Sequence, residues 1–230
     1  MLIGSGTTLE RAWDGLDEEG RLALVGAMNS NARLLDGMLS SSLDYARLEA
    51  GELWVSFEPF DISAMLRAAC AHIEGAIGDR HMRIDIEEGL LASGDVVLIR
   101  RIVSTLLGNA SVHTPPGTTI TVSCKRRGDA VTVEIADDGP GIPDEDLPFI
   151  GERFFRGGET NARPKGLGLG LALALNILEL HGSTLVVENA ADGGARFSFS
   201  LPSVADPTAM PGDLESTIDP SLSAPHRGRA

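Results

Sequence analysis

The chain has 230 residues, enough for one sizeable domain with a small addition but too few for two full domains. It carries 33 acidic against 19 basic side chains, a formal net charge of −14, which argues against nucleic acid or an anionic membrane surface as the main partner. Two cysteines are too few for a disulfide framework, and the sequence has neither a signal-peptide pattern nor an apolar run that could span a bilayer, so we expect a cytoplasmic protein without direct membrane contact.

The first 51 residues predict the end of one helix and, after it, a second and long helix. Residues 1–15 have no capping signal and resemble the end of a helix that begins upstream, whereas Asp17 is a suitable N-cap for a helix that runs to about Gly51. A single apolar stripe of this length either packs on the chain's own domain or pairs with another helix in a coiled coil or bundle, and we favour the pairing. The stripe repeats at three- and four-residue steps: Leu22, Val25, Met28, Ala32, Leu35, Leu39, Leu43 and Ala46.

Residues 52–202 alternate strands and helices. We predict a strand at 52–58 that ends at Pro59, a helix from the Asp61 cap to about 77, a strand at 82–87 and a helix from the Asp95 cap to 113. Hairpins are expected at 120–136 and 185–201, with a helix at 168–181 between them. This order predicts an α+β two-layer sandwich, in which a mixed sheet carries helices on one face. Residues 203–230 contain scattered prolines and acids and no aromatic residue, and we expect them to be disordered.

Three local patterns between residues 100 and 172 could carry chemistry. Thr105, Asn109 and His113 share one face of a predicted helix, where an asparagine in a cleft can offer its carbonyl oxygen to Mg²⁺. The segment 137–143 (DDGPGIP) follows a strand, and its Asp137 carboxylate can accept a hydrogen bond from a purine amino group. The segment 165–172 (KGLGLGLA) leads into a helix, where glycines expose backbone N–H groups to a phosphate chain.

Each pattern also has an ordinary structural interpretation: a helix asparagine with its bonds satisfied, a Gly/Pro turn, and a loop whose glycines allow close packing. The glycine loop is neither a dinucleotide-binding turn, because no strand precedes it, nor a phosphate loop with a Lys-Ser/Thr pair. The occurrence of all three patterns in this order is what indicates a nucleotide site.

In this order the patterns resemble the motifs of sensor histidine kinases. LLGNASVHTPPG resembles the N box of the family's ATP-binding domain, DDGPGIP the G1 box, GERFFRGG the F box and GLGLGLALALNILELHG the G2 box. The helix that ends in LDYARLEAG resembles the second helix of the family's dimerisation and phosphotransfer hairpin. The resemblance covers about residues 16–202 and implies the Bergerat-type (GHKL) ATP-binding fold. It divides the chain into a truncated hairpin at 1–51, a catalytic domain at 52–202 and a tail at 203–230.

The resemblance also implies a site for ATP and Mg²⁺. Asn109 would bind Mg²⁺, Asp137 would bind the adenine amino group, and His113 would pack near the base. Gly139 and Gly141 would shape the adenine pocket, the G2 box would bind the phosphates, and a mobile lid at 157–165 would bring flanking cations to phosphate oxygens. The residues expected to bind the nucleotide are Asn109, His113, Asp137, Gly139, Gly141, Arg156, Lys165, Gly166, Gly168, Leu169, Gly170 and Leu171.

Three positions depart from the family pattern. Thr105 replaces the first N-box asparagine, Val112 replaces a lysine or arginine that holds phosphates, and Gly151 replaces the first F-box phenylalanine. We expect these changes to weaken nucleotide binding without abolishing it. In the hydrolase relatives a glutamate at the Thr105 position activates water, so Thr105 argues against an ATPase of the gyrase or chaperone type.

The phosphoacceptor histidine of this family would lie upstream of Met1, and none of His72, His81, His113, His181 and His226 fits its place. We therefore expect a histidine protein kinase that is not self-sufficient. It would donate the γ-phosphoryl group of ATP to a histidine on a hairpin helix absent from this chain, for relay to a response regulator. Residues 16–50 would bind a second copy or a hairpin-bearing kinase partner. The alternative is a non-catalytic ATP-sensing or dimerising module; an anti-sigma-factor serine kinase has a similar pocket but no such helix.

Overall fold

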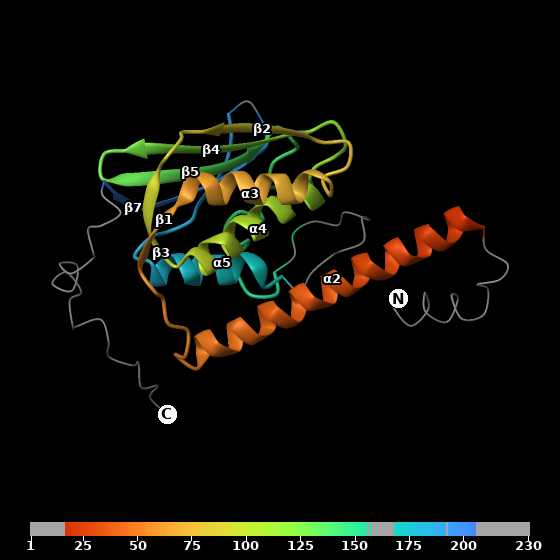
Figure 1. The fold of residues 1–230 in the computed structure, drawn as a ribbon, viewed down its shortest axis with the longest axis horizontal. Helices are drawn as coiled ribbons and strands as arrows, with labels where there is room; N and C mark the ends of the chain where they lie inside the picture. The colour runs from red at the N-terminus through yellow and green to blue at the C-terminus, as the bar shows by residue number, and fades with distance from the viewer. Residues whose placement is uncertain (1–16, 156, 158–167, 192, 206–230) are drawn as a thin grey trace.

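The computed structural model describes residues 17–155, 157, 168–191 and 193–205 (Figure 1). The elements of the first half are α2 (Glu18–Glu49), β1 (Glu58–Asp61), α3 (Ile62–Glu74), β2 (His81–Ile86), β3 (Leu91–Gly94) and α4 (Val96–His113). Those of the second half are β4 (Thr119–Arg127), β5 (Ala130–Asp137), α5 (Gly170–Leu180), β6 (Val186–Asn189) and β7 (Ala195–Val204). The helix starts predicted at Asp17, Asp61 and Asp95 are confirmed, because each carboxylate accepts a hydrogen bond from a backbone N–H of the first turn.

One mixed sheet contains all the strands of the described ranges. Its order is β1-β3-β7-β5-β4-β2, with β6 also paired to β7. The β2–β4 pair is parallel and the other pairs are antiparallel. Strand β7, the last in the described ranges, thus lies inside the sheet, between β5 on one side and β6 and β3 on the other.

Helices α3, α4 and α5 cover one face of this sheet, which confirms the predicted two-layer α+β sandwich (Figure 1). Alternate residues of the central strands point toward the helices and are buried, whereas their neighbours on the other face are polar or half-buried. The buried members in β4 and β5 are Ile120, Val122, Cys124, Val131, Val133 and Ile135. The two cysteines, Cys70 and Cys124, are buried and free, and burial raises the pKa of their thiols to about 11 and about 12.

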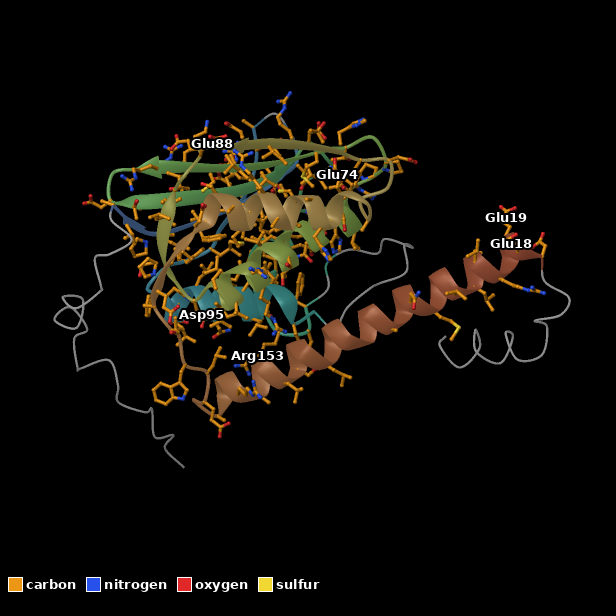
Figure 2. The ribbon with its side chains drawn as sticks, in the orientation of Figure 1. Glu18, Glu19, Glu74, Glu88, Asp95 and Arg153 are labelled. Carbon is orange, nitrogen blue, oxygen red and sulfur yellow. The ribbon has the colours of Figure 1, made fainter. Side chains whose placement is uncertain are left out.

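Helix α2 extends beyond the sandwich and contacts α5 (Figures 1 and 2). The predicted long helix is therefore present, and part of its apolar stripe faces solvent: Leu22, Val25, Leu39 and Leu43 are exposed. Among the helices of the described ranges, none has the length and apolar character needed to cross a membrane.

The predicted strand at 52–58 is wrong. The strand at this place is β1, Glu58–Asp61, and it includes Pro59. A proline is tolerated there because β1 pairs with β3 alone and lies at the edge of the sheet, where its missing N–H is not needed. The preceding residues form no strand, and Leu53 and Val55 pack against the core instead.

Strand β3 is not among the predicted elements, since its four residues show no alternation of polar and apolar side chains. Its pairing with β7 also corrects the expected start of the disordered tail, because Ser203 and Val204 pair with Ala92 and Leu91. The rest of that tail, from residue 206, and the expected helix end at 1–15 lie outside the described residues.

Candidate functional site

Asp137 is the last residue of β5, and one of its oxygens is held by the loop that directly follows it and by the distant start of β7. Oδ1 accepts hydrogen bonds from the backbone N–H of Gly139, at 3.0 Å, and from that of Ala195 at the start of β7, at 3.3 Å. Within the described part of the chain, no group donates a hydrogen bond to Oδ2. The carboxylate is therefore fixed in orientation and keeps one oxygen with which to accept a donor from a ligand.

Polar side chains lie close to the two glycines that follow Asp137. A Cβ on Gly139 would lie 2.8 Å from Asp137 Oδ1, and a Cβ on Gly141, where φ is +76°, would lie 2.8 Å from Asn189 Oδ1. At Gly141 the left-handed backbone conformation itself favours glycine, whereas a Cβ on Gly139 would displace the Asp137 carboxylate from this position. The protein's own polar groups thus explain these glycines, in addition to the predicted approach of a ligand.

Asn189 belongs to the site region but is not among the predicted residues. It is the last residue of β6, and its side-chain amide binds both backbone groups of Ile142: Oδ1 accepts the Ile142 N–H at 2.8 Å, and Nδ2 donates to the Ile142 carbonyl at 2.7 Å. The only signal for it in the sequence is an asparagine at the end of a predicted strand, which by itself points to a turn.

Helix α4 carries Asn109 and His113 to the same region. Asn109 is half-buried, whereas His113 is at the exposed end of the helix, where partial desolvation lowers its pKa. The next residue, Thr114, is buried and fixes this end of α4: its hydroxyl donates to the Ala110 carbonyl at 2.6 Å and accepts from Arg80 Nε at 2.8 Å. Arg80 also donates to the Thr114 carbonyl.

Two close contacts show that α4 lies against both glycine-containing segments. A Cβ on Gly139 would lie 3.2 Å from Thr114 Cγ2, and a Cβ on Gly170 would lie 3.0 Å from Thr105 Cγ2. Helix α4 therefore touches the DDGPGIP segment at its C-terminal end, next to Thr114. It touches the start of α5 closer to its middle, at Thr105. The three predicted patterns, which are far apart in the sequence, meet along this helix.

The GERFFRGG segment is attached to the start of the glycine-rich helix through backbone atoms. The Phe154 N–H donates to the Gly168 carbonyl at 3.0 Å, and a Cβ on Gly168, where φ is +68°, would lie 2.7 Å from the Phe155 carbonyl oxygen. Phe154 itself has a φ of 62° and its side chain is 65% exposed. A left-handed conformation costs a non-glycine residue about 1–2 kcal/mol, so this turn stores strain where the two segments meet.

Helix α5 begins without a side-chain cap, at the buried Leu169, and Leu171 packs against the core. The backbone N–H groups of its first turn are thus not satisfied by any capping side chain. Gly151 lies against this helix, since a Cβ on it would be 2.5 Å from Leu175 Cδ1, and a phenylalanine at this position would have to displace Leu175. Arg156, Lys165 and Gly166, with the predicted lid from residue 158 on, lie outside the described residues.

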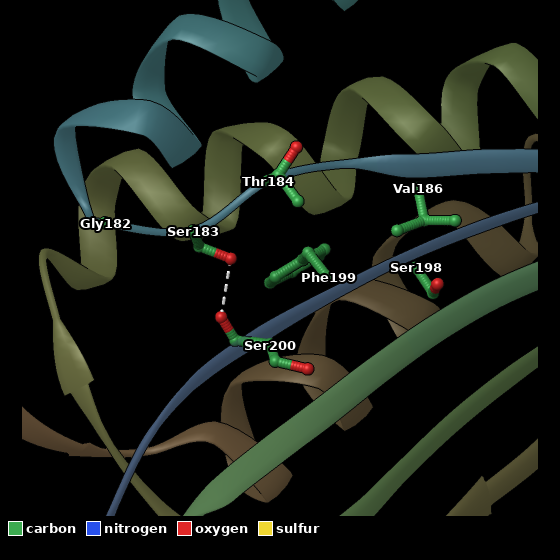
Figure 3. A pocket seen from close by; sticks show the side chains of 7 residues that line it. All are labelled: Gly182, Ser183, Thr184, Val186, Ser198, Phe199 and Ser200. Carbon is green, nitrogen blue, oxygen red and sulfur yellow. Dashed lines mark hydrogen bonds between the residues drawn. The ribbon is translucent and has the colours of Figure 1, made fainter.

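A hollow of about 440 Å³ lies beside β6 and β7, and it contains none of the predicted site residues (Figure 3). Its lining carries no charged side chain, and the Ser183 hydroxyl donates to the Ser200 carbonyl at 2.6 Å within it. It offers no positively charged side chain to a triphosphate. In the described ranges no cluster of three or more His, Cys, Asp or Glu side chains could hold a metal by itself, so an Mg²⁺ at Asn109 would need ligand oxygens from phosphate and water.

His181 connects the end of α5 to the start of α4. Its buried ring accepts the Asp95 backbone N–H at Nε2, at 3.0 Å, and Nδ1 lies 2.7 Å from the Ile177 carbonyl oxygen. These partners require a proton on Nδ1 and a lone pair on Nε2, the neutral tautomer. Burial lowers the pKa of His181, although the Ile177 carbonyl and the Asp95 carboxylate act in the opposite direction.

This arrangement predicts that acid destabilises the fold. Because the pKa of His181 is lower in the folded than in the unfolded chain, its stabilising contribution is complete above about pH 6.5 and is lost as the pH falls through the folded pKa. Urea unfolding at a series of pH values should show the free energy of unfolding falling below about pH 6.5. The His181→Gln variant should show a flatter decline, part of which remains because His113 has a shift of the same sign. The matched variant His72→Gln, at an exposed position, should follow the wild-type curve; identical slopes for both variants would contradict the assignment.

The model of the histidine kinase-, DNA gyrase B- and HSP90-like ATPase family matches residues 94–205, from the end of β3 to β7. Residues 94–205 belong to this ATPase family. The matched range contains the N-, G1-, F- and G2-box segments and every contact of Asp137, Asn189 and α4 described above, apart from those made by Arg80. The chain therefore contains an ATP-binding domain of the histidine kinase type.

Curated relatives are histidine kinases and sensor proteins. The signal transduction histidine-protein kinase AfsQ2 of Streptomyces coelicolor is 30% identical over 87% of this chain and 38% of its own length. The sensor protein DivL of Caulobacter vibrioides is 32% identical over 93% of this chain and 27% of its own length. The chain thus spans between about a quarter and two fifths of these relatives.

Solved structures give the same fold. The mycobacterial sensor histidine kinase MprB is 27% identical, with a TM-score of 0.57 over 64% of this chain and 98% of that chain. The histidine kinase ThkA, solved in complex with the response regulator protein TrrA, is 21% identical, with a TM-score of 0.62 over 87% of this chain and 57% of that chain.

Proposed function

We propose that the chain is the ATP-binding catalytic part of a two-component sensor histidine kinase, and that its nucleotide site is the region where α4 meets the G1 and G2 segments. The observation that supports this most directly is the Asp137 carboxylate, whose Oδ1 is held by Gly139 and Ala195 while Oδ2 remains to accept the adenine amino group. A carboxylate fixed before the ligand arrives loses little freedom on binding and favours one donor geometry.

The proposed roles of the other nucleotide-binding residues follow from their places on α4, on the G1 segment and at the start of α5. Asn109 would place its side-chain oxygen on Mg²⁺, which when bound neutralises phosphate charge, and His113, neutral at pH 7, would pack beside the base. Gly168, Leu169, Gly170 and Leu171 would present the uncapped backbone N–H groups of α5 to the phosphates. Gly139 and Gly141 would shape the adenine pocket, and Arg156, Lys165 and Gly166 would add phosphate contacts.

Phosphoryl transfer requires a nucleophile held in line with the γ-phosphate. Thr105 lacks the carboxylate with which a hydrolase would activate water, and its methyl group packs against Gly170. We propose that the acceptor is a histidine on a hairpin helix absent from these 230 residues. The phosphoryl group would then pass to a response regulator. The structure of the histidine kinase ThkA in complex with the response regulator protein TrrA supports a partner of this kind. The exposed apolar side chains of α2 support pairing of residues 17–49 with such a helix or with a second copy.

The test is to mix this chain with a separate polypeptide that carries the histidine hairpin of a sensor kinase, in the presence of γ-labelled ATP and Mg²⁺. We expect acid-labile label on the hairpin polypeptide in the mixture and no label on either polypeptide alone. The same hairpin with its histidine replaced by glutamine is the control and should stay unlabelled. ATP binding without transfer would favour a non-catalytic ATP-sensing or dimerising module, and label on the isolated chain would contradict the proposed division of roles.

A further inference from the structure

We propose that Asn189 is a positioning residue for the nucleotide site, which holds the G1 segment so that Asp137 meets the adenine amino group. The inference rests on the proposed function for what Asp137 binds. The contact between Asn189 and Ile142, which lie 47 positions apart in the sequence, is independent of what Asp137 binds.

The side chain of Asn189 acts on the far end of the G1 segment. Its amide group accepts from the Ile142 N–H and donates to the Ile142 carbonyl, at 2.8 and 2.7 Å, so a single side chain satisfies both backbone groups of one loop residue. A two-point contact of this kind fixes orientation as well as distance, because a rotation or sideways shift of the loop lengthens or misaligns at least one of the bonds. Gly141 lies beside it with a φ of +76°, which favours glycine, and a Cβ there would come within 2.8 Å of Asn189 Oδ1 and disturb this contact.

The near end of the G1 segment is held from the same place. Asn189 pairs with Ala195 across the β6–β7 turn, and the Ala195 N–H donates to Asp137 Oδ1. Gly194 of this turn lies directly against the Asp137 backbone. The two residues that flank the β6–β7 turn therefore hold both ends of the segment: Ala195 binds it at residue 137 and Asn189 binds it at residue 142. The short loop between these two points is fixed at each end.

Asn189 is suited to a positioning role rather than to a role in global stability. The residue is exposed, and the hydrogen bonds it makes with Ile142 are at the surface. Hydrogen bonds at the surface contribute little to global stability because water replaces them. Loss of this side chain should therefore free the loop while leaving the sandwich folded.

The experiment measures how well the site recognises the 6-amino group of adenine. Dissociation constants of Mg·ATP and Mg·ITP, which has an oxygen in place of the amino group, are determined by calorimetry for the wild-type chain and for Asn189→Ala. We expect the wild type to bind ATP at least roughly tenfold more tightly than ITP. In the variant this ratio of dissociation constants should be smaller by a factor of about three or more. Asn176→Ala is the matched control: it removes an asparagine whose Nδ2 donates to the Ala172 carbonyl within α5, and the preference should stay unchanged.

A second readout is independent of any nucleotide. Hydrogen exchange of the Ile142 amide, followed by NMR, should become at least about tenfold faster in Asn189→Ala, while amides in the centre of β5 keep their protection. Faster exchange together with a reduced ATP preference supports the inference. An ATP preference equal to that of the wild type in Asn189→Ala overturns it. A wild-type chain that binds ATP and ITP equally overturns the proposed role of Asp137 instead, and the exchange of Ile142 then still reports whether Asn189 holds the loop.

Discussion

The Asp137→Asn variant is expected to bind ATP about 10- to 100-fold more weakly than the wild type, as measured by calorimetry with Mg²⁺ in excess. An asparagine can keep the hydrogen bonds from Gly139 and Ala195 by placing its oxygen where Oδ1 was. Its NH₂ group then occupies the place of Oδ2 and faces the adenine amino group, so that two donors meet. The variant loses a charge-assisted hydrogen bond and leaves the shape of the site unchanged.

The neighbouring variant Asp138→Asn is the matched control. It removes the same charge one residue further on, from an exposed carboxylate whose Oδ1 accepts the Thr119 N–H at 2.6 Å, a hydrogen bond that lowers the pKa of Asp138. Because this side chain bonds to β4 and not to the segment around Gly139, ATP binding should change by less than about twofold. Equal losses in the two variants would indicate a general effect of charge and would contradict a specific contact between Asp137 and adenine.

Gly194→Ala is expected to lower the free energy of unfolding by about 3–5 kcal/mol, measured by urea unfolding. Gly194 has a φ of +84° and is buried, and a Cβ on it would overlap the carbonyl oxygen of Asp137. Alanine thus has to adopt a left-handed conformation and also separate the β6–β7 turn from the end of β5. The displacement is backbone against backbone, which no rotation of a side chain can relieve.

Gly128→Ala separates these two contributions. Gly128 lies in the β4–β5 turn with a φ of +62°, and a Cβ there would meet no atom within 4 Å. Its replacement should cost only the left-handed conformation, about 1–2 kcal/mol. A loss in Gly194→Ala no greater than that in Gly128→Ala would show that the turn can move away from Asp137, and it would weaken the case for the turn as the support of the site.

The elements that the sequence predicted correctly are those whose signals are local. The aspartates that cap α3 and α4, and the alternation of buried residues in β4 and β5, are visible within a few positions of each element. The predicted position of the first strand is wrong because a proline such as Pro59 breaks a strand only where the neighbouring strand needs a backbone N–H donor at that position. That need depends on which strands flank it, and the edge position of β1 is a property of the assembled sheet.

In the candidate site, too, the residues with a local sequence signal could be predicted and those that depend on the assembled sheet could not. The segment that begins at Asp137 could be found in the sequence because its carboxylate and glycines are contiguous. Its supports could not, because Ala195 lies 58 positions from Asp137, Asn189 lies 47 positions from Ile142, and Arg80 lies 34 positions from Thr114. Each of these is an ordinary residue type whose contribution arises only when β6, β7 and the start of β2 are brought beside the site.

The position of β7 has a consequence for synthesis. In the described sheet this strand joins the β1–β3 pair to the β5–β4–β2 group, yet it is the last strand to be translated. When Asp137 leaves the ribosome, a further 58 residues must follow before Ala195 can bind it, which takes about 3 to 12 s at typical elongation rates. During that interval β3 and β5 expose unpaired edges in the growing polypeptide, and such edges attract other chains. Chaperone binding to nascent chains of this protein should therefore be strongest after β5 emerges and should end when β7 inserts.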